Sequence, residues 1–369
     1  MLLTIQCDDP NALWIIGHLE PMILRVWASI TTATKSFTGK RIITKAADIS
    51  SDDCARSAFE QMYKHNVLSQ HLLKFHDFGA RGGSSYETVS WSGMGHTANF
   101  LGSDTVGAIV MAADHYDCDC AAFSIPATEH SIKTALGPGQ GEIDITRRVL
   151  KQFGNFPIFA DVIDGYDTMN ALKHIWGGVL KDEAIASNAH TIVMRPDSGH
   201  PVEMPLKVVD GLAETFGTVK NKKGFNIINK FRVIQGDGID LEIMEEICDE
   251  IIKRGYAIDN IAFGMGGGLI QSQTRDTLKF AAKCSWLDIN GVEHFVFKDP
   301  ITDPGKTSKK GMMILEVDEN GEFFTTSGLY EDQYIQFSPR NKLRTVYSLG
   351  WLENQTTLER VRLLGESFV

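Results

Sequence analysis

Residues 231–268 read FRVIQGDGIDLEIMEEICDEIIKRGYAIDNIAFGMGGG, and this stretch sets the expected fold class. A short apolar run at 231–234 ends in a glycine-containing loop, and a second apolar run follows at 261–263. Between the two runs, Leu241–Arg254 carries apolar residues at helical spacing. A strand, a helix and a second strand in this order form a βαβ unit, which predicts a parallel sheet.

The same alternation of strand and helix extends to both sides of this stretch. Strands are expected at 121–125, 157–163, 191–194, 231–234, 261–263 and 293–297, and helices at 104–115, 145–153, 167–176, 205–216, 241–254 and 272–283. Five or more such units favour an α/β fold built as a parallel (β/α) barrel, although an open doubly wound sheet also fits the pattern.

We expect three segments along the chain. Residues 1–80 read as a mostly helical lead-in, and residues 81–311 would form the barrel. Residues 312–369 are expected to be a β-rich C-terminal segment, because Asn320-Gly321 stands between two runs of strand-forming residues. An Asn-Gly pair in that setting is typical of a β-hairpin turn.

Composition and charge exclude several classes of protein. The 369 residues are 43% hydrophobic and carry a formal net charge of -11, and an acidic surface repels nucleic acid and anionic membranes. No stretch reaches the roughly 20 apolar residues of a membrane span, and Met1–Pro10 lacks the pattern of a secretory signal. The six cysteines form no CxxC pair, and Cys118-Asp119-Cys120 is expected in a loop rather than in a metal site. These features indicate a cytoplasmic protein.

Polar or glycine-rich clusters follow five of the expected strands. They are PATEH (126–130), DGYD (164–167), RPDSG (195–199), GDGID (236–240) and GMGGG (264–268). Ligands of parallel α/β folds bind where strands end, because loops and helix N-termini converge there. One such cluster is explained by turns and helix caps alone. Five in a row, carrying histidine, arginine and several aspartates, favour an active site.

The last two clusters are suited to phosphate. Gly266-Gly267-Gly268 lacks Cβ atoms, so the backbone can approach a phosphate and turn several N–H groups toward it. Gly236-Asp237-Gly238 could add a carboxylate for a ribose hydroxyl or Mg²⁺. Neither cluster fits the GxGxxG pattern of a dinucleotide fold.

Two further stretches have both a functional and a structural interpretation. The first is FHDFGARGGSS (75–85). In the functional interpretation a ligand ring stacks on Phe78 and Arg81 faces an anion, and in the structural one the stretch is a turn with an exposed arginine. The lysines at 298–310 either neutralise a polyphosphate or lie in a solvated loop.

Six stretches then occur together in one order: FHDFGARG (75–82), PATEHS (126–131), RPDSG (195–199), RVIQGDG (232–238), FGMGGGL (263–269) and KDP to SKKG (298–311). This set resembles the nicotinamide phosphoribosyltransferase family over about residues 7–317. The resemblance implies an irregular (β/α) barrel of the type II phosphoribosyltransferase kind with a partial β-rich second domain. It implies that nicotinamide and phosphoribosyl pyrophosphate give nicotinamide mononucleotide and pyrophosphate, a step of NAD salvage. Mg²⁺, ATP as a stimulating co-substrate, and a homodimer with shared active sites are implied as well.

The resemblance also assigns residues to the base. Phe78 would stack on the nicotinamide ring, and Asp104 would accept a hydrogen bond from the carboxamide NH₂. Ser124 and Arg81 would lie near the carboxamide and the ribose phosphate. A carboxylate at position 104 repels the carboxylate of nicotinate, which favours nicotinamide as the substrate.

Other assigned residues would bind the sugar and the phosphates. Arg195 and Asp197 would hold the base and ribose. The 5′-phosphate and ribose would be cradled by Gly236, Asp237, Gly266 and Gly267. Three further residues would face pyrophosphate, and in the family they come from the neighbouring subunit. They are Arg275, Lys283 and Lys298.

His130 matches the histidine that members of the family phosphorylate with ATP. A neutral imidazole is a nucleophile near pH 7, and Asp164 or Asp197 could orient it. A structural histidine at a strand end is the alternative interpretation.

The sequence departs from the family pattern in three places. Family members begin with over a hundred residues ahead of the segment that matches Cys7–Asp9, so a shortened member is expected. Ala281 stands where the family has a phosphate-contacting serine, and Met312 where an arginine is common. A catalytically incomplete fragment, or half of a split enzyme, therefore stays open beside the active enzyme. Nicotinate phosphoribosyltransferase is a third alternative.

Overall fold

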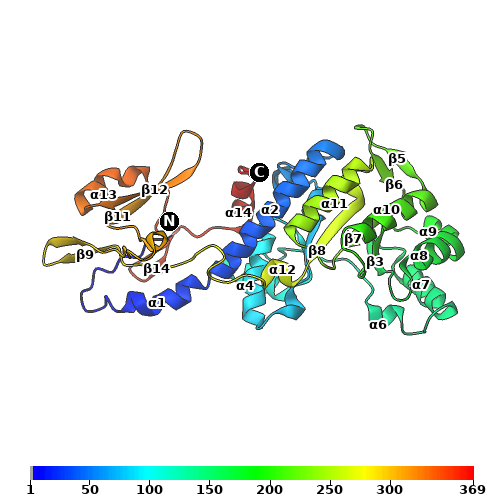
Figure 1. Cartoon of the computed structure of the whole chain (residues 1–369), viewed down its shortest axis with the longest axis horizontal. Coiled ribbons are helices and arrows are strands. Elements are labelled where there is room, and N and C mark those ends of the chain that lie inside the picture. Colours follow the sequence, from blue (N-terminus) through cyan, green and yellow to red (C-terminus); the bar gives the residue numbers. More distant parts are fainter. Residues whose placement is uncertain (1–2) are drawn as a thin grey trace. The chain divides into compact units, whose positions relative to one another are not determined.

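A computed structural model describes residues 3–369, which divide into two compact units. The barrel unit combines Val26–Thr277 with Thr357–Val369, and the hairpin unit combines the residues before Val26 with Leu278–Thr356 (Figure 1). Among the described residues, no helix is long and apolar enough to cross a membrane.

The barrel unit is built on a parallel sheet, which confirms the expected fold class. Within residues 3–369 this sheet has six strands in the order β2-β1-β8-β7-β4-β3, and every neighbouring pair is parallel. The strands are β1 (Phe75–Asp77), β2 (Gly102–Ser103), β3 (Ile158–Val162), β4 (Thr191–Arg195), β7 (Phe231–Gln235) and β8 (Ile261–Met265). Their carboxyl ends therefore meet at one rim, as the sequence predicts.

The segment 121–128 joins the two edges of this sheet. Beside β2, the Phe123 amide donates to the Leu101 carbonyl oxygen at 2.6 Å. Beside β3, the Ala160 amide donates to the Pro126 carbonyl oxygen at 2.8 Å. Both contacts are isolated parallel bridges, so the expected strand at 121–125 is not a regular one. The segment nevertheless occupies the position of a strand that closes the curled sheet into a barrel.

Helices pack around this sheet (Figure 1). They are α2 (Trp27–Ser50), α3 (Ala58–His65), α4 (Tyr86–Thr97), α5 (Val106–Tyr116), α6 (His130–Lys133), α7 (Gln140–Phe153), α8 (Thr168–Asn170), η3 (Ala171–Val179, a π-helix), α9 (Lys181–Ala186), α10 (Glu203–Phe216), α11 (Leu241–Lys253), α12 (Gly267–Ile270) and α14 (Leu358–Glu366). Short 3₁₀ turns are η1 (Gln70–Leu73), η2 (Ala80–Gly82) and η4 (Ile258–Asn260), and an antiparallel pair joins β5 (Thr218–Lys220) to β6 (Asn226–Ile228).

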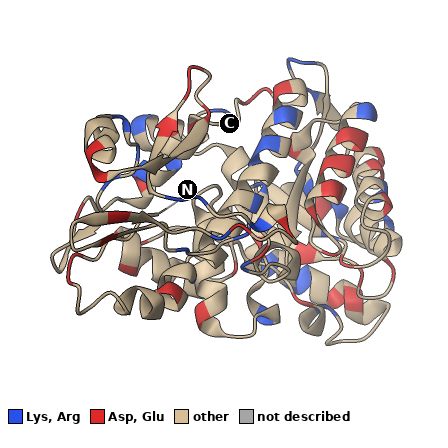
Figure 2. Ribbon diagram, turned by 60° about the vertical axis from the view of Figure 1, so that its left-hand side comes forward, with Lys and Arg blue, Asp and Glu red and all other residues tan. Residues whose placement is uncertain are grey.

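The helix α11 illustrates why these elements form. Asp240 caps it, because its carboxylate accepts a hydrogen bond from the Ile243 amide at 2.8 Å. Met244, Ile247 and Ile251 share one face and are fully buried. The outer helices carry both acidic and basic residues (Figure 2).

The C-terminal helix α14 belongs to the barrel unit. The buried Arg362 guanidinium donates to the carbonyl oxygens of Thr97 at 2.8 Å and Ala121 at 2.5 Å, and to the Tyr63 hydroxyl at 2.7 Å. Glu366 accepts from the Phe59 amide at 2.7 Å. This helix therefore holds the start of the segment 121–128.

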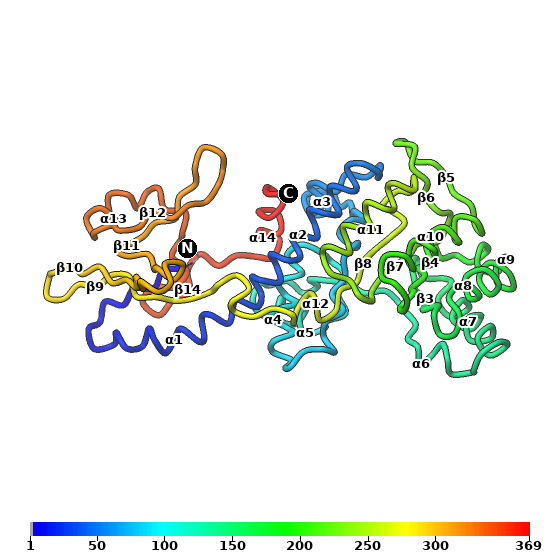
Figure 3. Tube along the Cα trace, viewed as in Figure 1, coloured from blue at the N-terminus to red at the C-terminus, as the bar shows by residue number. Residues whose placement is uncertain are grey.

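The hairpin unit consists of short antiparallel pairs and three-turn or shorter helices (Figure 3). Its elements are α1 (Ile15–Leu24), β9 (Trp286–Ile289), β10 (Val292–Phe295), η5 (Pro304–Lys306), β11 (Met312–Val317), β12 (Phe323–Leu329), α13 (Glu331–Phe337), η6 (Ser338–Arg340), β13 (Tyr347–Ser348) and β14 (Trp351–Leu352). The expected hairpin is present as β11 and β12, with Gly321 at φ +85° in the connecting turn.

Two expected elements differ from the structure. Residues 272–283, all of them described, form turns and irregular chain instead of a helix, and Lys279 has φ +56°, a left-handed conformation that a right-handed helix does not contain. The expected strand 293–297 lies in the hairpin of β9 and β10 and not in the parallel sheet. Asn290 and Gly291 both have positive φ, which turns the chain directly back on itself.

The bounds of the two units also differ from the expected segments 1–80, 81–311 and 312–369. The strand β1 lies inside the sheet, between β2 and β8, and not in a helical lead-in. Three residues are too few to show a strand periodicity. The long helix α2 packs on α4 and α11, so it is part of the barrel unit.

Candidate active site

Seven loops meet at the carboxyl rim of the barrel unit. They follow β1, β2, the segment 121–128, β3, β4, β7 and β8. The rim therefore brings together most of the residues singled out from the sequence: Phe78, Arg81, Asp104, Ser124, His130, Asp164, Arg195, Asp197, Gly236, Asp237, Gly266 and Gly267.

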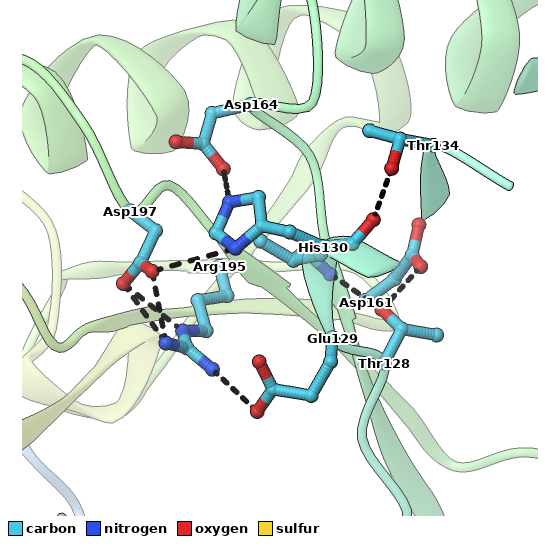
Figure 4. A network of polar contacts seen from close by, with 9 residues as sticks. Thr128, Glu129, His130, Thr134, Asp161, Asp164, Arg195 and Asp197 are labelled. Atoms are coloured by element: carbon cyan, nitrogen blue, oxygen red, sulfur yellow. Dashed lines mark hydrogen bonds and ion pairs between the residues drawn. The ribbon is translucent and has the colours of Figure 1, made fainter. Parts of the chain in front are cut away.

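His130 is the first residue of α6, and its imidazole lies between two carboxylates (Figure 4). Nε2 is 3.0 Å from Asp164 Oδ1, and Nδ1 is 3.9 Å from Asp197 Oδ2. A carboxylate only accepts hydrogen bonds, so Nε2 carries the proton in the neutral ring and Nδ1 does not. The side chain is 43% exposed, whereas that of Asp164 is 5% exposed. The ring is thus half-exposed, and its unprotonated Nδ1 has the lone pair that a nucleophile needs.

Arg195 neutralises the carboxylate beside His130. Its Nη2 lies 3.0 Å from both oxygens of Asp197, and Nε lies 3.2 Å from Oδ1. Nη1 is 3.8 Å from Glu129 Oε1. This forked contact fixes the direction of Asp197 and pairs its charge with the guanidinium.

Phe78 places an aromatic ring on the same rim. The Arg195 guanidinium carbon is 5.7 Å from the ring centroid. The ring also lies against two glycines, because a Cβ atom on Gly236 would be 3.1 Å from it and one on Gly264 only 2.0 Å. Glycine at 264 is therefore required for the ring to occupy this position.

Asp104 and Ser124 form a second polar pair. The Ser124 hydroxyl donates to Asp104 Oδ1 at 2.6 Å, and the Asp104 amide donates to the carbonyl oxygen of Asp77, the residue before Phe78. Asp104 also lines a cavity of about 350 Å³ with Tyr86 and Val106. A carboxylate acceptor thus stands next to the loop that carries the aromatic ring.

The two glycine clusters lie at the N-termini of α11 and α12. Gly238 has φ +65°, a conformation that favours glycine. None of the described atoms lies within 4 Å of a Cβ built on Gly267, so the backbone there is open to a ligand. Lys35 Nζ donates to the Gly268 carbonyl oxygen at 2.5 Å and so restrains this loop.

Three expected cations lie outside the loops that follow the strands. Arg275 pairs with Asp276, with Nη2 and Oδ1 2.6 Å apart. Lys283 and Lys298 are exposed residues of the hairpin unit. Arg81 does lie on the rim, in the exposed turn η2.

Sequence reasoning missed several buried polar residues. Asp77 is fully buried, accepts from the Gly79 amide at 2.8 Å, and has its pKa raised to about 6 by burial. A buried ion pair joins Lys133 to Asp161 below His130. Asp161 could have been singled out from the sequence, because it is a polar residue within the apolar strand 158–162.

This curled parallel sheet is the type II phosphoribosyltransferase fold. The crystal structure of nicotinate-nucleotide pyrophosphorylase from Pyrococcus furiosus is similar, with a TM-score of 0.52 and 15% sequence identity over 92% of this chain and 69% of that chain.

Sequence comparison identifies the family. Residues 73–351 match the nicotinate phosphoribosyltransferase (NAPRTase) family. The chain is 41% identical to a nicotinamide phosphoribosyltransferase of Xanthomonas campestris pv. campestris over 98% of its own length and 74% of that relative. It is 30% identical to a nicotinamide phosphoribosyltransferase of Acinetobacter baylyi over 98% of its own length and 72% of that relative. The chain therefore belongs to the nicotinate phosphoribosyltransferase family, and it is a pentosyltransferase of NAD salvage.

The contact between Gly264 and Phe78 leads to a first prediction. In Gly264→Ala the new methyl group displaces the ring, and stacking of a base on an aromatic ring is worth roughly 1–3 kcal/mol. We expect the KM for the pyridine base to rise about ten-fold. Gly365→Ala in α14, where none of the described atoms crowds a Cβ, is the control. An unchanged KM in Gly264→Ala would contradict the role of the ring.

The burial of Asp77 leads to a second prediction. Its pKa rises from 3.8 to about 6, so the folded state keeps a proton that the unfolded state loses as pH increases. Ionising this carboxyl therefore costs stability, up to about 3 kcal/mol above pH 6. In Asp77→Asn this cost is absent.

The measurement is chemical denaturation of both proteins between pH 4 and pH 8. The stability of Asp77→Asn relative to the wild type should increase from pH 4 to pH 6 and then level off. Asp119→Asn, at an exposed loop position, is the control. A stability difference that does not vary with pH would show that Asp77 is not the group responsible.

Proposed function

We propose that this enzyme transfers the phosphoribosyl group of phosphoribosyl pyrophosphate to nicotinamide, giving nicotinamide mononucleotide and pyrophosphate. The observation that carries the proposal is the carboxylate of Asp104, which Ser124 orients at 2.6 Å. A carboxylate accepts a hydrogen bond from the carboxamide NH₂ of nicotinamide but repels the carboxylate of nicotinate. The names of the relatives at 41% and 30% identity agree with this choice of base.

The rim supplies groups for both ends of the sugar. Phe78 would stack on the base, while Arg195 and Asp197 would contact the base and ribose. The open glycine loops, with Gly267 at the most accessible position, would receive the 5′-phosphate through backbone N–H groups. Because the transition state is oxocarbenium-like, carboxylates beside the sugar stabilise the positive charge that develops on it.

Mg²⁺ fits this site as the counter-ion of pyrophosphate. The Asp237 carboxylate is exposed on the rim and is an oxygen ligand of the kind that Mg²⁺ prefers. The bound ion would neutralise charge on the leaving pyrophosphate. Arg275, Lys283 and Lys298 would add further positive charge from a second copy of the chain, which is why we propose a homodimer.

The six cysteines are all free, in agreement with a cytoplasmic enzyme.

We further propose that ATP phosphorylates His130. Nδ1 would attack the γ-phosphorus, the bond to the bridging oxygen of ADP would break, and ADP would leave. The Nε2–H···Asp164 hydrogen bond would stabilise the positive charge that the ring gains during attack. Hydrolysis of the phosphohistidine returns the free imidazole, so ATP hydrolysis can be coupled to tighter substrate binding.

Product analysis with two bases tests the proposed substrate. With phosphoribosyl pyrophosphate and Mg²⁺, nicotinamide should give its mononucleotide and nicotinate should react at least about 100-fold more slowly. Asp104→Asn should reduce this preference at least about ten-fold, because an amide no longer repels nicotinate. Asp114→Asn, at an exposed position of α5, is the matched control. Equal turnover of both bases, or no product from either, would refute the proposal.

A second experiment tests the role of His130. The ratio of turnover with ATP to turnover without it should exceed one in the wild type and should fall to one in His130→Ala. The acid-labile phosphate signal in ³¹P NMR should vanish in parallel. His190→Ala removes an exposed histidine of the same unit and should keep both properties. A wild-type response to ATP in His130→Ala would exclude this residue as the phosphate acceptor.

A further inference from the structure

The ion pair between Lys133 and Asp161 is the most deeply buried one near the active site. Nζ and Oδ2 are 2.8 Å apart, and the side chains are 2% and 0% exposed. Removing two charges from water costs several kcal/mol per ion, so such a pair is a poor device for stability alone. Its location therefore requires another explanation.

Both oxygens of the Asp161 carboxylate accept hydrogen bonds. Asp161 Oδ1 accepts from the Thr128 hydroxyl at 2.8 Å, and Oδ2 accepts from Trp176 Nε1 at 3.0 Å in addition to Lys133. Lys133 Nζ also donates to the Thr146 hydroxyl at 2.6 Å. The network is thus directional, with both carboxylate oxygens engaged, and this makes it rigid.

This network holds the chain on both sides of His130. Thr128 lies two residues before the histidine, and Lys133 lies three residues after it. Both side chains bond to the same carboxylate, and the Thr128 hydroxyl accepts a further bond from the Val162 amide at 2.8 Å. Figure 4 shows the contact of Thr128 with Asp161 beside His130.

The Asp161 carboxylate lies on the strand that leads to Asp164, the hydrogen-bond partner of His130. Asp161 belongs to β3, and Asp164 follows three residues later. One anchor therefore sets the position of the histidine and of the carboxylate that bonds to its Nε2. The helix α6 has only four residues, so it has little stability of its own and depends on such an anchor.

We propose that the buried Lys133–Asp161 pair is a positioning device that holds the His130 imidazole against Asp164, so that Nδ1, on the side of Asp197, is fixed in place for phosphoryl transfer. This inference rests on the proposed phosphorylation of His130. Neither residue touches the reacting atoms. Both act through the backbone of 128–133 and through β3.

The test replaces the pair without leaving a buried charge. In K133M/D161N the asparagine oxygen can accept from Trp176, and its NH₂ can donate to the Thr128 hydroxyl. A buried ion pair exchanged for neutral groups of similar volume often keeps its stability. We expect the rate of phosphohistidine formation from ATP to fall at least about ten-fold, whereas turnover without ATP changes less than about two-fold.

A second buried pair of the barrel unit provides the matched control. Lys40 Nζ and Glu366 Oε1 are 3.4 Å apart, with side chains 6% and 7% exposed, and they join α2 to α14. The variant K40M/E366Q makes the same chemical change away from His130. Its melting temperature can shift, but phosphohistidine formation should stay within about two-fold of the wild type.

Thr128 offers an independent variant should K133M/D161N not fold. Thr128→Val keeps the shape but removes the bond to Asp161, so phosphohistidine formation should slow as in the double variant. Thr128→Ser keeps the hydroxyl and should restore it. A purely structural role would lower turnover with and without ATP equally in all of these variants, and that result would overturn the proposal.

The outcomes distinguish the two proposals. Wild-type rates of phosphohistidine formation in K133M/D161N, or in Thr128→Val, would overturn the positioning role and leave the phosphorylation of His130 intact. No phosphohistidine in the wild-type protein would overturn the phosphorylation step, and with it the positioning role. A selective loss in K133M/D161N and Thr128→Val, with rescue by Thr128→Ser, would support both.

Discussion

Main-chain hydrogen bonds from the segment 121–128 to both edges of the parallel sheet are the constraint on which the site depends. The segment pairs with β2 at Phe123 and with β3 at Ala127. At its first end Ser124 meets Asp104, which follows β2, and at its second end His130 meets Asp164, which follows β3. One stretch of chain therefore links the place proposed for the base to the place proposed for the phosphoryl group.

Buried polar groups hold the loops at both ends of the parallel sheet. Asp77 accepts from the Gly79 amide below the Phe78 turn, and Asp161 anchors both sides of His130. At the opposite end, where β1 and β8 begin, Lys74 Nζ donates to three carbonyl oxygens around η4, and burial lowers its pKa to about 7. Each group loses its hydration, and each is placed where a loop needs fixed hydrogen bonds that regular secondary structure does not supply.

The rim combines rigid and open parts. Phe78, Arg195 and Asp197 are held by stacking and forked hydrogen bonds, whereas the backbone at Gly267 is accessible. A preorganised set of charges with an open glycine loop suits an enzyme that must hold a sugar phosphate while its bond to pyrophosphate breaks. The fold places these parts, and the chemistry of each residue determines what it can do.

Local sequence determined much of this protein. The glycine, aspartate and histidine clusters at strand ends, the amphipathic helix α11 and the Asn-Gly turn before β12 were predictable, because spacing along the chain encodes turns, caps and periodicity. Tertiary structure alone decided the place of β1 between β2 and β8, the closure of the sheet by 121–128, and the contact of Lys133 with Asp161. These features depend on partners far apart in the chain, and burial changes what a lysine or an aspartate does, which no local pattern records.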